Sequence, residues 1–480
     1  MRALTSAGAL DELSHDQGII SLRPAAAFVA EDENEVLAVL GDARRRGLAV
    51  TPRGAGTSIP SQAVGTGVIL LQRQSGRRKG EGSVTCGSSV VKADLNKELD
   101  AAGSWVPPDP SSYQSCTVGG MVANNSSGTR TLKYGSTIDF VRELRTILPE
   151  EGAKVIRPIP LAEALEGDST TRKVASIVIE GQKLIQKEKP RVTKNSSGYR
   201  LERVVHDGVF DLPKLFVGSE GTLGIFTDVT FRTAPKPKSR VLLVVETSLP
   251  ELDRVASLFR ALSPSAVELV DKSVFREVGR ETRLLALSRS EEDYLVYCEL
   301  DGGEEDVKST LESAAASDIA GLEPLTVTDP GRMAEVLDMR NEILTLAAEI
   351  RRGSRRFLPG VEDLTVPPER LGDLISLLKD QFERRGLSYI SYGHAGDANL
   401  HMRPLLDPDS PSQRRTLEDI MDECFDAVWR MRGTMSGEHG DGMLRARYVR
   451  RQYPETHELM KQVREAYDPK GLLNPGVKIV

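Results

Sequence analysis

The stretch PRGAGTS, Pro52–Ser58, comes directly after Leu48–Thr51, a short apolar run that is typical of a buried strand. Its glycines permit positive φ angles, so successive backbone N–H groups can turn inward around a pyrophosphate, and its Thr and Ser hydroxyls add further donors. Ahead of the strand, Glu35–Arg46 has the apolar spacing and the basic end of an amphipathic helix. A tight turn after a strand can have the same composition, so this stretch alone leaves a structural turn open.

Two more clusters of small residues lie in the same half of the chain. One runs from Pro107–Pro110 into Thr117–Gly128 (TVGGMVANNSSG), and the other is Gly218–Gly224 (GSEGTLG). Asn and Ser side chains in such clusters can hydrogen-bond the edge of a flat heterocycle. The strict G-x-G-x-x-G fingerprint of a Rossmann dinucleotide domain is missing from the chain. The three clusters together favour a cofactor site of another kind over turns alone.

The rest of the pattern predicts two domains of the α+β class, which fits a length of 480 residues. Ala234–Lys238 (APKPK) predicts a linker, because its prolines cannot continue a helix or a central strand. We therefore expect domains over residues 1–235 and 236–480. Residues 160–190 are charged and irregular and predict a surface insertion. In the second domain, predicted strands alternate with predicted helices: Val241–Glu246, Tyr294–Glu299, Leu252–Ala261 and Arg370–Arg385.

Composition excludes several classes of protein. Hydrophobic residues make up 39% and charged residues 28%, which is typical of a soluble globular protein, and a net charge of -7 argues against nucleic-acid binding. No apolar run approaches the roughly 20 residues that cross a bilayer, and no secretory signal is evident, so we expect no transmembrane segment and a cytoplasmic protein. The four cysteines are too scattered for a disulfide framework or an iron–sulfur cluster, and we expect buried free thiols: Cys86, Cys116, Cys298 and Cys424.

Half of the six histidines fall in two short segments of the second domain. In HAGDANLH, His394–His401, a four-residue hairpin turn at Gly396–Asn399 would place the two terminal histidines opposite each other, with Cβ atoms about 5 Å apart. In SGEHGDG, Ser436–Gly442, glycines leave Glu438 and His439 free to enter a crowded site. Two imidazoles and one carboxylate are a common set of ligands for a divalent metal. Spacing alone leaves a metal site and ordinary hydrogen-bonded histidines equally open, because the strong H-E-x-x-H pattern is absent.

In combination, PRGAGTS, GGMVANNSSG with the later KYG (Lys133–Gly135), and VGSEGTLG (Val217–Gly224) resemble the FAD-binding domain of the vanillyl-alcohol oxidase (PCMH-type) family of FAD-linked oxidases. The branch that the chain resembles contains D-lactate dehydrogenase, D-2-hydroxyglutarate dehydrogenase and the glycolate oxidase catalytic subunit. The likeness runs from about Ser21 to LLNPGVKIV. It implies a two-subdomain PCMH-type FAD-binding domain, then an α+β cap domain with an antiparallel sheet, and a final segment that returns to the flavin.

The resemblance also implies where FAD binds. Pro52–Ser58 would surround the pyrophosphate, while Pro108–Gly128 and Gly218–Gly224 would line the flavin and its adenosine. No histidine stands in the first glycine loop, so we expect FAD to be bound non-covalently. The expected cofactor-binding residues are Pro52, Arg53, Gly54, Ala55, Gly56, Thr57, Ser58, Pro108, Asp109, Gly119, Gly120, Ala123, Asn124, Ser127, Gly128, Glu220, Gly221, Gly224, Ile225 and Asn474.

For the histidine segments, the resemblance favours the metal. It implies that His394, His401 and Glu438 hold a divalent ion, Zn or Mn, and that His439 is the catalytic base. Arg340 resembles the arginine that binds the substrate carboxylate, a role that suits the bidentate fork of arginine.

One departure from the family bears on the substrate. Relatives that act on 2-hydroxyglutarate carry Asn two residues after the position of His401 and Lys near position 361, whereas this chain has Arg403 and Val361. A long dicarboxylate is therefore not expected, and Arg403 joins Arg340 as an expected substrate-binding residue.

The expected function is oxidation of a small, D-lactate-like 2-hydroxy acid to the 2-oxo acid, with hydride passing to flavin N5 and the hydroxyl proton to His439. Alternatives are a D-2-hydroxyglutarate or glycolate dehydrogenase subunit, a metal-dependent hydrolase or non-haem iron oxygenase, and a flavin-binding electron-transfer subunit without chemistry of its own. The metal-dependent classes leave the glycine clusters unexplained.

The electron acceptor is expected on another protein. SGEHGDG, rather than SGEHGIG, resembles the flavin part of fusions whose iron–sulfur domain would begin just after Pro475–Lys478. We expect electrons to pass to a separate iron–sulfur protein, electron-transfer flavoprotein, cytochrome or quinone, through which the protein would be peripheral to a membrane. A homodimer is compatible with these observations.

Overall fold

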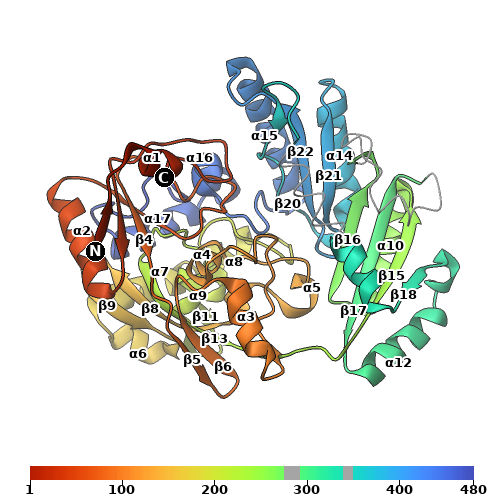
Figure 1. The fold of residues 1–480 in the computed structure, drawn as a ribbon, viewed down its shortest axis with the longest axis horizontal. Coiled ribbons are helices and arrows are strands. Elements are labelled where there is room, and N and C mark those ends of the chain that lie inside the picture. Colours follow the sequence, from red (N-terminus) through yellow and green to blue (C-terminus); the bar gives the residue numbers. More distant parts are fainter. Residues whose placement is uncertain (275–291, 339–349) are drawn as a thin grey trace.

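The structure is a computed structural model that describes residues 1–274, 292–338 and 350–480, in which two bodies lie side by side (Figure 1). The left-hand body in that view, here called the N-terminal body, is built mainly from residues 1–235 and 440–480. The right-hand body, here called the cap, is built around one large sheet from the residues between them.

The first sheet of the N-terminal body places the PRGAGTS loop. Its strand order is β1-β2-β4-β3, in which β2, β4 and β3 are parallel and β1 is antiparallel to β2. Helix α2 (Glu33–Arg45), close to its predicted range, covers the sheet and is capped by Asp32, whose side chain accepts from Glu35 N at 2.9 Å. The glycine loop leaves the carboxyl end of β3. The strands are β1 (Arg2–Leu4), β2 (Ala26–Ala30), β3 (Val50–Arg53) and β4 (Val68–Gln72).

The second sheet of this body is antiparallel, with the order β5-β6-β13-β8-β9. Its central strand β13 directly follows the GSEGTLG cluster and packs against α4, the helix of the TVGGMVANN segment. The strands are β5 (Arg77–Gly80), β6 (Ser83–Gly87), β8 (Val141–Leu148), β9 (Gly152–Ile156) and β13 (Ile225–Arg232), and the neighbouring helices are α3 (Lys92–Asp100), α4 (Val118–Asn124), α5 (Thr131–Tyr134) and α9 (Pro213–Phe216).

The prediction of an irregular insertion over residues 160–190 is wrong, because three helices lie there: α6 (Leu161–Glu166), α7 (Ser169–Glu180) and α8 (Gln182–Glu188). The side chain of Asp168 caps α7 by accepting from Thr170 N and Thr171 N. One narrow apolar stripe, which includes Val174 and Val178, is buried, and α7 packs against the C-terminal helix α17 (Thr456–Tyr467). The charged residues on the exposed face hide this stripe in the sequence.

Two small sheets complete the N-terminal body, and the connection to the cap follows them. β10 (Ile159–Pro160), β12 (Val209–Phe210) and β11 (Val205–His206) form one, and β7 (Ser104–Trp105) with β14 (Ala234–Pro235) forms the other. The predicted boundary between residues 235 and 236 falls between β14 and the first cap strand, which begins at Ser239.

The cap sheet is antiparallel with the order β18-β15-β17-β16-β21-β22-β19, and β20 also pairs with β22. This agrees with the predicted α+β class and antiparallel second sheet. The strands are β15 (Ser239–Thr247), β16 (Ala266–Asp271), β17 (Tyr294–Gly302), β18 (Leu325–Val327), β19 (Arg356–Phe357), β20 (Leu364–Thr365), β21 (Tyr389–His394) and β22 (Asn399–Leu406), and the helices are α10 (Leu252–Ala261), α12 (Glu304–Ala315), α14 (Leu371–Glu383) and α15 (Pro411–Arg430).

Alternation along these strands gives the cap sheet two different faces. Val245, Val296 and Leu269 lie on one face and share a core with α10 and α14. Tyr392 and His394, two residues apart on β21, lie on the other face, which is the face of the predicted metal site.

After the cap, the chain returns to the N-terminal body. Helices α16 (Gly442–Gln452) and α17 lie among its elements (Figure 1). Leu473 forms a parallel bridge with Val50 of β3, as the expected return of the final segment requires.

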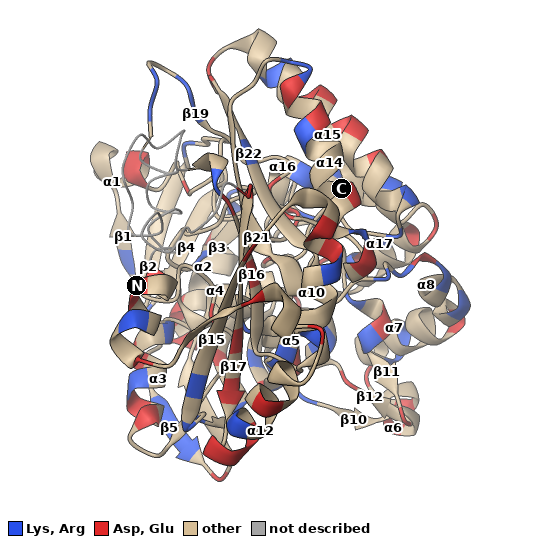
Figure 2. Cartoon of the chain, turned by 90° about the vertical axis from the view of Figure 1, so that its right-hand side faces the viewer, with Lys and Arg blue, Asp and Glu red and all other residues tan. Residues whose placement is uncertain are grey.

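Three predictions from composition can be compared with the structure. All four cysteines are buried and unpaired, as expected. Within the described ranges, no helix is both long and apolar enough to cross a membrane. Acidic and basic residues lie side by side along α12, α14 and α15, so this side of the molecule carries no face of a single charge (Figure 2).

Candidate active site

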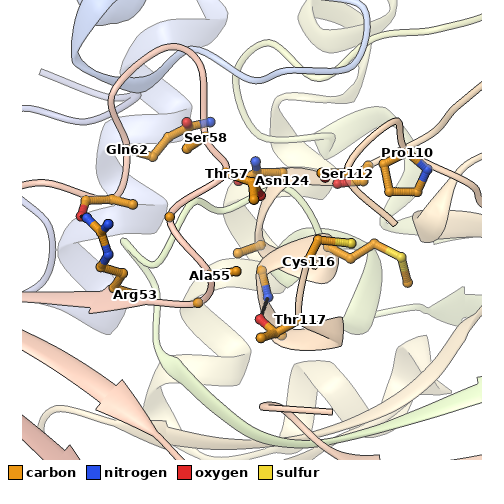
Figure 3. A pocket seen from close by; sticks show the side chains of 18 of the residues that line it. Arg53, Ala55, Thr57, Ser58, Gln62, Pro110, Ser112, Cys116, Thr117 and Asn124 are labelled. Carbon is orange, nitrogen blue, oxygen red and sulfur yellow. Dashed lines mark hydrogen bonds between the residues drawn. The ribbon is translucent and has the colours of Figure 1, made fainter. Parts of the chain in front are cut away.

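A long cavity, open to solvent, runs through the N-terminal body between the PRGAGTS loop and α4. Figure 3 shows Arg53, Ala55 and Thr57 of the loop facing Thr117 and Asn124 across it. The two walls meet so closely that a Cβ on Gly54 would lie 2.5 Å from Thr117 Oγ1. Close packing therefore favours glycine at that point, whereas Gly56 is the glycine of the loop that adopts a positive φ angle, of 71°.

Several polar atoms along this cavity are buried and have no hydrogen-bond partner in the part of the chain that the structure describes. They belong to four lining residues and are Ser58 Oγ, Gln62 Oε1, Gln72 Oε1 and Ser88 Oγ. An unsatisfied buried polar group costs about 1–3 kcal/mol. Four such groups around one cavity indicate a polar ligand that supplies their missing hydrogen bonds.

Glu438 and His439 also line this cavity, so the cavity lies next to the histidines of the cap. Glu438 Oε1 lies 3.3 Å from His394 Nε2 and 3.3 Å from His401 Nε2, and 3.9 Å from His439 Nε2. Ligand atoms about 2.0–2.1 Å from a tetrahedral metal lie roughly 3.3–3.4 Å apart. Glu438 Oε1 therefore lies at the spacing of a metal site from the Nε2 atoms of both His394 and His401.

The predicted register of the His394–His401 hairpin is wrong, although the two histidines do meet. His394 pairs with Asn399 and His401 pairs with Tyr392, because the turn is a 3-10 turn at Ala395–Asp397, one residue earlier than predicted. The two histidines are diagonal neighbours on one face of the sheet, and their ring centroids lie 5.2 Å apart. Diagonal neighbours with long side chains can contact each other as directly opposed residues do.

The other nitrogen of each ring is already engaged. His394 Nδ1 lies 2.6 Å from Glu268 Oε1, and His401 Nδ1 contacts the backbone carbonyl of Glu362. An Nδ1–H donated to a carboxylate or carbonyl fixes the tautomer that leaves Nε2 as a lone-pair donor. Both Nε2 atoms point to the same carboxylate oxygen, which is the arrangement that a metal-binding pair requires.

The two oxygens of Glu438 serve opposite sides of the site. Oε1 faces the histidines, whereas Oε2 accepts from Ser127 Oγ at 2.9 Å and from Lys194 Nζ at 3.1 Å. Burial would raise the pKa of Glu438, but the charge of Lys194 and the contacts with His394 and His401 hold it well below its ordinary value. Glu438 is thus ionised, with one oxygen free to bind a cation.

Asp363 also lies near these ligands: one donor atom from each of Asp363, His401, Glu438 and His439 falls within 4.8 Å of the others. Its carboxylate, however, accepts the backbone N–H groups of Glu438 and His439 at 2.9–3.1 Å and the hydroxyl of Ser436 at 2.8 Å. These bonds occupy its lone pairs, so Asp363 fixes the backbone of the loop and is not counted as a ligand.

His439 sits where the cavity meets the histidine cluster. Its backbone is held at both ends, the N–H by Asp363 and the carbonyl by Gln62 Nε2 at 2.7 Å, and 19% of its side chain stays exposed to the cavity. Burial lowers its pKa to about 4. The imidazole is neutral near pH 7, as a proton acceptor must be.

Of the two arginines expected to bind substrate, only Arg403 lies within the described residues. Arg403 lies two residues beyond His401 on β22, on the same face of the sheet, and its charge acts on His439 and Glu362. Its Nε is buried and has no hydrogen-bond partner within the described residues. Arg340 lies outside the described residues, so its predicted role stays untested.

Comparison with known families decides what this cavity belongs to. Residues 24–155 match the family described as FAD binding domain, and residues 235–477, about half of the chain, match FAD linked oxidases, C-terminal domain. The chain belongs to the FAD-linked oxidases. Its N-terminal body therefore contains the FAD-binding domain, and the C-terminal domain of this family comprises the cap together with helices α16 and α17, which return to the N-terminal body.

Among characterised members, the FAD-linked oxidase described here is 30% identical to D-2-hydroxyglutarate dehydrogenase from Pantoea ananatis, over 97% of the chain and 49% of that protein. It is 28% identical to D-lactate dehydrogenase from Archaeoglobus fulgidus, over 95% of the chain and 93% of that protein. The chain thus spans about half the length of the first relative and nearly all of the second.

Solved structures share the fold. p-Cresol methylhydroxylase aligns over 100% of the chain and 94% of its own with a TM-score of 0.70 at 13% identity, and alkyldihydroxyacetonephosphate synthase over 99% and 82% with a TM-score of 0.68 at 15% identity. The predicted PCMH-type architecture is confirmed.

The residues expected to bind FAD fall into two groups. Most line the cavity beside the unpartnered polar atoms, so the chain fits the cofactor: Pro52, Arg53, Gly54, Ala55, Gly56, Thr57, Ser58, Gly119, Gly120, Ala123, Asn124, Ser127, Glu220 and Gly221. The others lie behind the lining: Pro108, Asp109, Gly128, Gly224, Ile225 and Asn474. In this second group, Asp109 accepts from Thr129 and Arg130, and Asn474 bonds Thr51, Gln62 and Glu220.

Several residues of the site were not expected from the sequence. Glu268, Glu362 and Gln62 act on histidines that are 126, 39 and 377 residues away, and no local pattern marks them. Lys194 is different, because a single lysine within the small-residue run KNSSG is a weak sign of a buried cation. Its side chain is fully buried.

Proposed function

We propose that the protein oxidises a small, D-lactate-like 2-hydroxy acid to the 2-oxo acid with bound FAD. The observation that carries this proposal is that Glu438 and His439 line the FAD-type cavity and Glu438 contacts the histidine cluster. Relatives that are D-lactate or D-2-hydroxyglutarate dehydrogenases support the same reaction class.

Different residues accept the substrate proton and bind the substrate carboxylate. His439 accepts the hydroxyl proton at its cavity-facing ring nitrogen, for which its low pKa keeps it neutral. Arg403 binds the substrate carboxylate with a guanidinium whose Nε has no hydrogen-bond partner among the described residues, and Arg340 is proposed to assist it. Together they orient the α-hydrogen toward the flavin side of the cavity. When bound, FAD supplies the two-electron acceptor at flavin N5, and a divalent metal supplies a Lewis acid for the hydroxyl.

We further propose that His394, His401 and Glu438 hold this divalent ion, zinc or manganese. The engaged Nδ1 atoms and the 3.3 Å donor spacing support it. The balance of charge supports it as well, because carboxylates outnumber cations around the cluster within the described residues: Glu268, Glu362, Asp363, Asp397 and Glu438 against Lys194, Arg403 and Arg445.

The test is an anaerobic screen of D- and L-2-hydroxy acids, in which bleaching of the flavin absorbance is recorded with and without a chelator. Small D-acids should bleach the flavin, and the chelator should slow bleaching unless Zn²⁺ or Mn²⁺ is restored. His439→Asn should keep FAD and lose bleaching by more than about 100-fold.

Other outcomes of this screen would contradict the proposal. A colourless protein would favour a metal-dependent hydrolase or non-haem iron oxygenase, and a yellow protein that no acid bleaches would favour a pure electron-transfer subunit. Preferential bleaching by D-2-hydroxyglutarate or by glycolate would move the substrate to those alternatives.

We propose that the electrons leave to a separate acceptor. The four buried cysteines lie far apart in the sequence and cannot together bind an iron–sulfur cluster. A reduced enzyme that is reoxidised slowly by O₂ but rapidly by an artificial dye acceptor supports this step, whereas fast turnover with O₂ alone contradicts it. Location and oligomeric state stay predictions.

A further inference from the structure

We propose that Lys478, in the final segment of the chain, positions the loop that carries His439. The inference rests on the proposed function, because it concerns the residue that would accept the substrate proton. Lys478 does not line the FAD cavity. Neither the residue type nor its place in LLNPGVKIV suggests such a role.

Lys478 joins three distant segments through one buried ammonium group. Its Nζ lies 2.8 Å from Glu220 Oε1, 3.0 Å from Asp441 Oδ2 and 2.9 Å from the carbonyl of Ser196. The side chains of Lys478, Glu220 and Asp441 are fully buried. A buried ammonium with three acceptors holds its partners tightly, because water cannot replace any of these bonds.

Glu220 passes this restraint to the catalytic loop. Its two carboxylate oxygens accept the backbone N–H groups of Asp441 and Gly442, both at 2.8 Å. Gly440 lets the carboxylate approach, since a Cβ there would lie 2.5 Å from Glu220 Oε1. Lys478 also adds a backbone bond, from its N–H to the carbonyl of Gly442 at 3.2 Å.

The backbone around these contacts is strained. Lys478, Glu220 and Asn474 all adopt left-handed φ angles, of 62°, 54° and 42°. Such angles in residues other than glycine persist only where surrounding contacts impose them, and they gather at functional sites. Asn474 contributes to this constraint by donating to the carbonyls of Glu220 and Gln62.

The consequence for His439 follows from how its loop is held on each side. Asp363 fixes the N-terminal side through the N–H groups of Glu438 and His439. On the C-terminal side, Arg445 binds the carbonyl of Gly440, and the Glu220–Lys478 pair binds the next two N–H groups. Without Lys478, Glu220 is a buried carboxylate beside Asp441 with no cation between them, and the two repel each other. The loop then shifts on the side of the proton acceptor.

The experiment compares Lys478→Met with Lys470→Met in the FAD-loaded protein. Lys470 is a matched control, an exposed lysine eight residues earlier that pairs with Glu150 at 3.6 Å. In K478M, the rate constant of flavin reduction at saturating substrate should fall about 100-fold, the loss expected from a displacement of about 1 Å. The FAD content and the Kd of oxalate, measured by its shift of the flavin spectrum, should stay within threefold of wild type. K470M should match wild type throughout.

The result that overturns the proposal is a K478M enzyme that reduces its flavin at the wild-type rate. If K478M does not retain FAD, the variant E220Q/K478M removes the unpaired carboxylate and replaces it in the test. FAD retention with slow reduction in that variant supports positioning. A wild-type rate means that Lys478 only offsets charge, and loss of FAD in both variants assigns it to cofactor retention; either result overturns the proposal.

A failure of the proposed function would be distinguishable. If no 2-hydroxy acid reduces the wild-type flavin, hydrogen exchange of the backbone amides of Asp441 and Gly442 tests Lys478 alone, because both donate to Glu220. Faster exchange in K478M but not in K470M supports the role of Lys478. Equal exchange in all three proteins overturns it.

Discussion

At the scale of the residue, two neighbours on one loop are pushed toward opposite functions. Glu438 is ionised because Lys194 and His394 stabilise its negative charge against the effect of burial, whereas His439 is neutral because burial disfavours its positive charge. A fixed anion and a neutral base side by side are what a cation site and a proton acceptor need. The shared backbone anchor, Asp363, keeps the two side chains in register.

The pKa of His439 predicts the acid limit of the reaction. A histidine that is half-protonated at about pH 4, and not at its ordinary value of 6.5, is almost fully neutral at pH 5. We expect kcat/KM to be nearly flat from pH 5 to 8 and to fall only as the pH approaches 4, since protonation removes the acceptor. A pH profile of flavin reduction by stopped flow measures this, and an acid limb near 6.5 would show that another group controls the rate.

Glu268 predicts how the metal is retained. Glu268→Gln keeps a hydrogen-bond acceptor for His394 Nδ1 but removes the charge, so we expect metal affinity to fall about 10–100-fold. Metal content after dialysis against graded chelator, measured by mass spectrometry, gives the change. Glu251→Gln, at an exposed position beside α10, is the control, and equal retention in both variants would contradict a role for Glu268 in holding His394.

At the scale of the element, the short helix α5 joins the two bodies. Arg130, just before it, binds both oxygens of Glu299 on cap strand β17 at 3.0 Å and Asp109 at 2.6 Å. Lys133 and Tyr134 then bind Asp301 of the same strand at 2.7 Å and 2.9 Å. A single turn of helix thus connects a loop behind the cofactor cavity to the sheet that carries the histidines.

Arg130→Met should therefore reduce stability strongly. It leaves Glu299, whose side chain is 1% exposed, without its forked partner, and breaking such a buried pair costs about 3–5 kcal/mol. Arg254→Met removes an exposed pair with Glu251 and should cost at most about 1 kcal/mol. The free energy of unfolding from urea titration measures both, and equal losses would contradict the proposed link between the bodies.

Elements also show how far sequence could predict this molecule. The glycine loops, cap strands β15 and β17 and helix α10 follow from local composition and spacing. They appear close to their expected ranges. The register of the His394–His401 hairpin does not follow from composition and spacing. A turn that starts at Ala395 and one that starts at Gly396 have almost the same composition and differ only by a shift of one residue along the chain. Helix α7 was missed because its apolar stripe is narrow and is completed only by α17, nearly 300 residues later.

The part of the site that could least be predicted from the sequence is the set of contacts between residues far apart in the chain. The residues proposed to bind the metal could be selected from their motifs, and the structure places them close together. The groups that orient them come from segments 126, 244 and 377 residues away: Glu268, Lys194 and Gln62. No local spacing encodes such pairs, since only the tertiary arrangement brings them into contact.

At the scale of the whole molecule, the cofactor cavity depends on both ends of the chain. The PRGAGTS loop, Glu438 and His439 line it, and Asn474, which follows α17, bonds to Thr51 just before the loop. We therefore expect the two bodies to unfold in one cooperative transition when FAD is bound.

FAD itself should stabilise this transition. At a free concentration 100 times its Kd, the cofactor adds about 2.7 kcal/mol to the free energy of unfolding, and the melting temperature should rise with FAD concentration. Differential scanning calorimetry of protein stripped of FAD and then titrated with it measures the shift. Two separate transitions, only one of which moves with FAD, would contradict a jointly built cavity.

The bond between Thr51 and Asn474 sets an order in time for biosynthesis. The partners are 423 residues apart, so at about 5–20 residues per second a ribosome needs on the order of 20–85 s to make Asn474 after Thr51. Throughout that interval the nascent glycine loop lacks the support that fixes it from behind, and its cavity is open on the side of His439. Cofactor capture therefore waits until Asn474 has been made, and a cell short of FAD would accumulate chains in which this cavity has not closed.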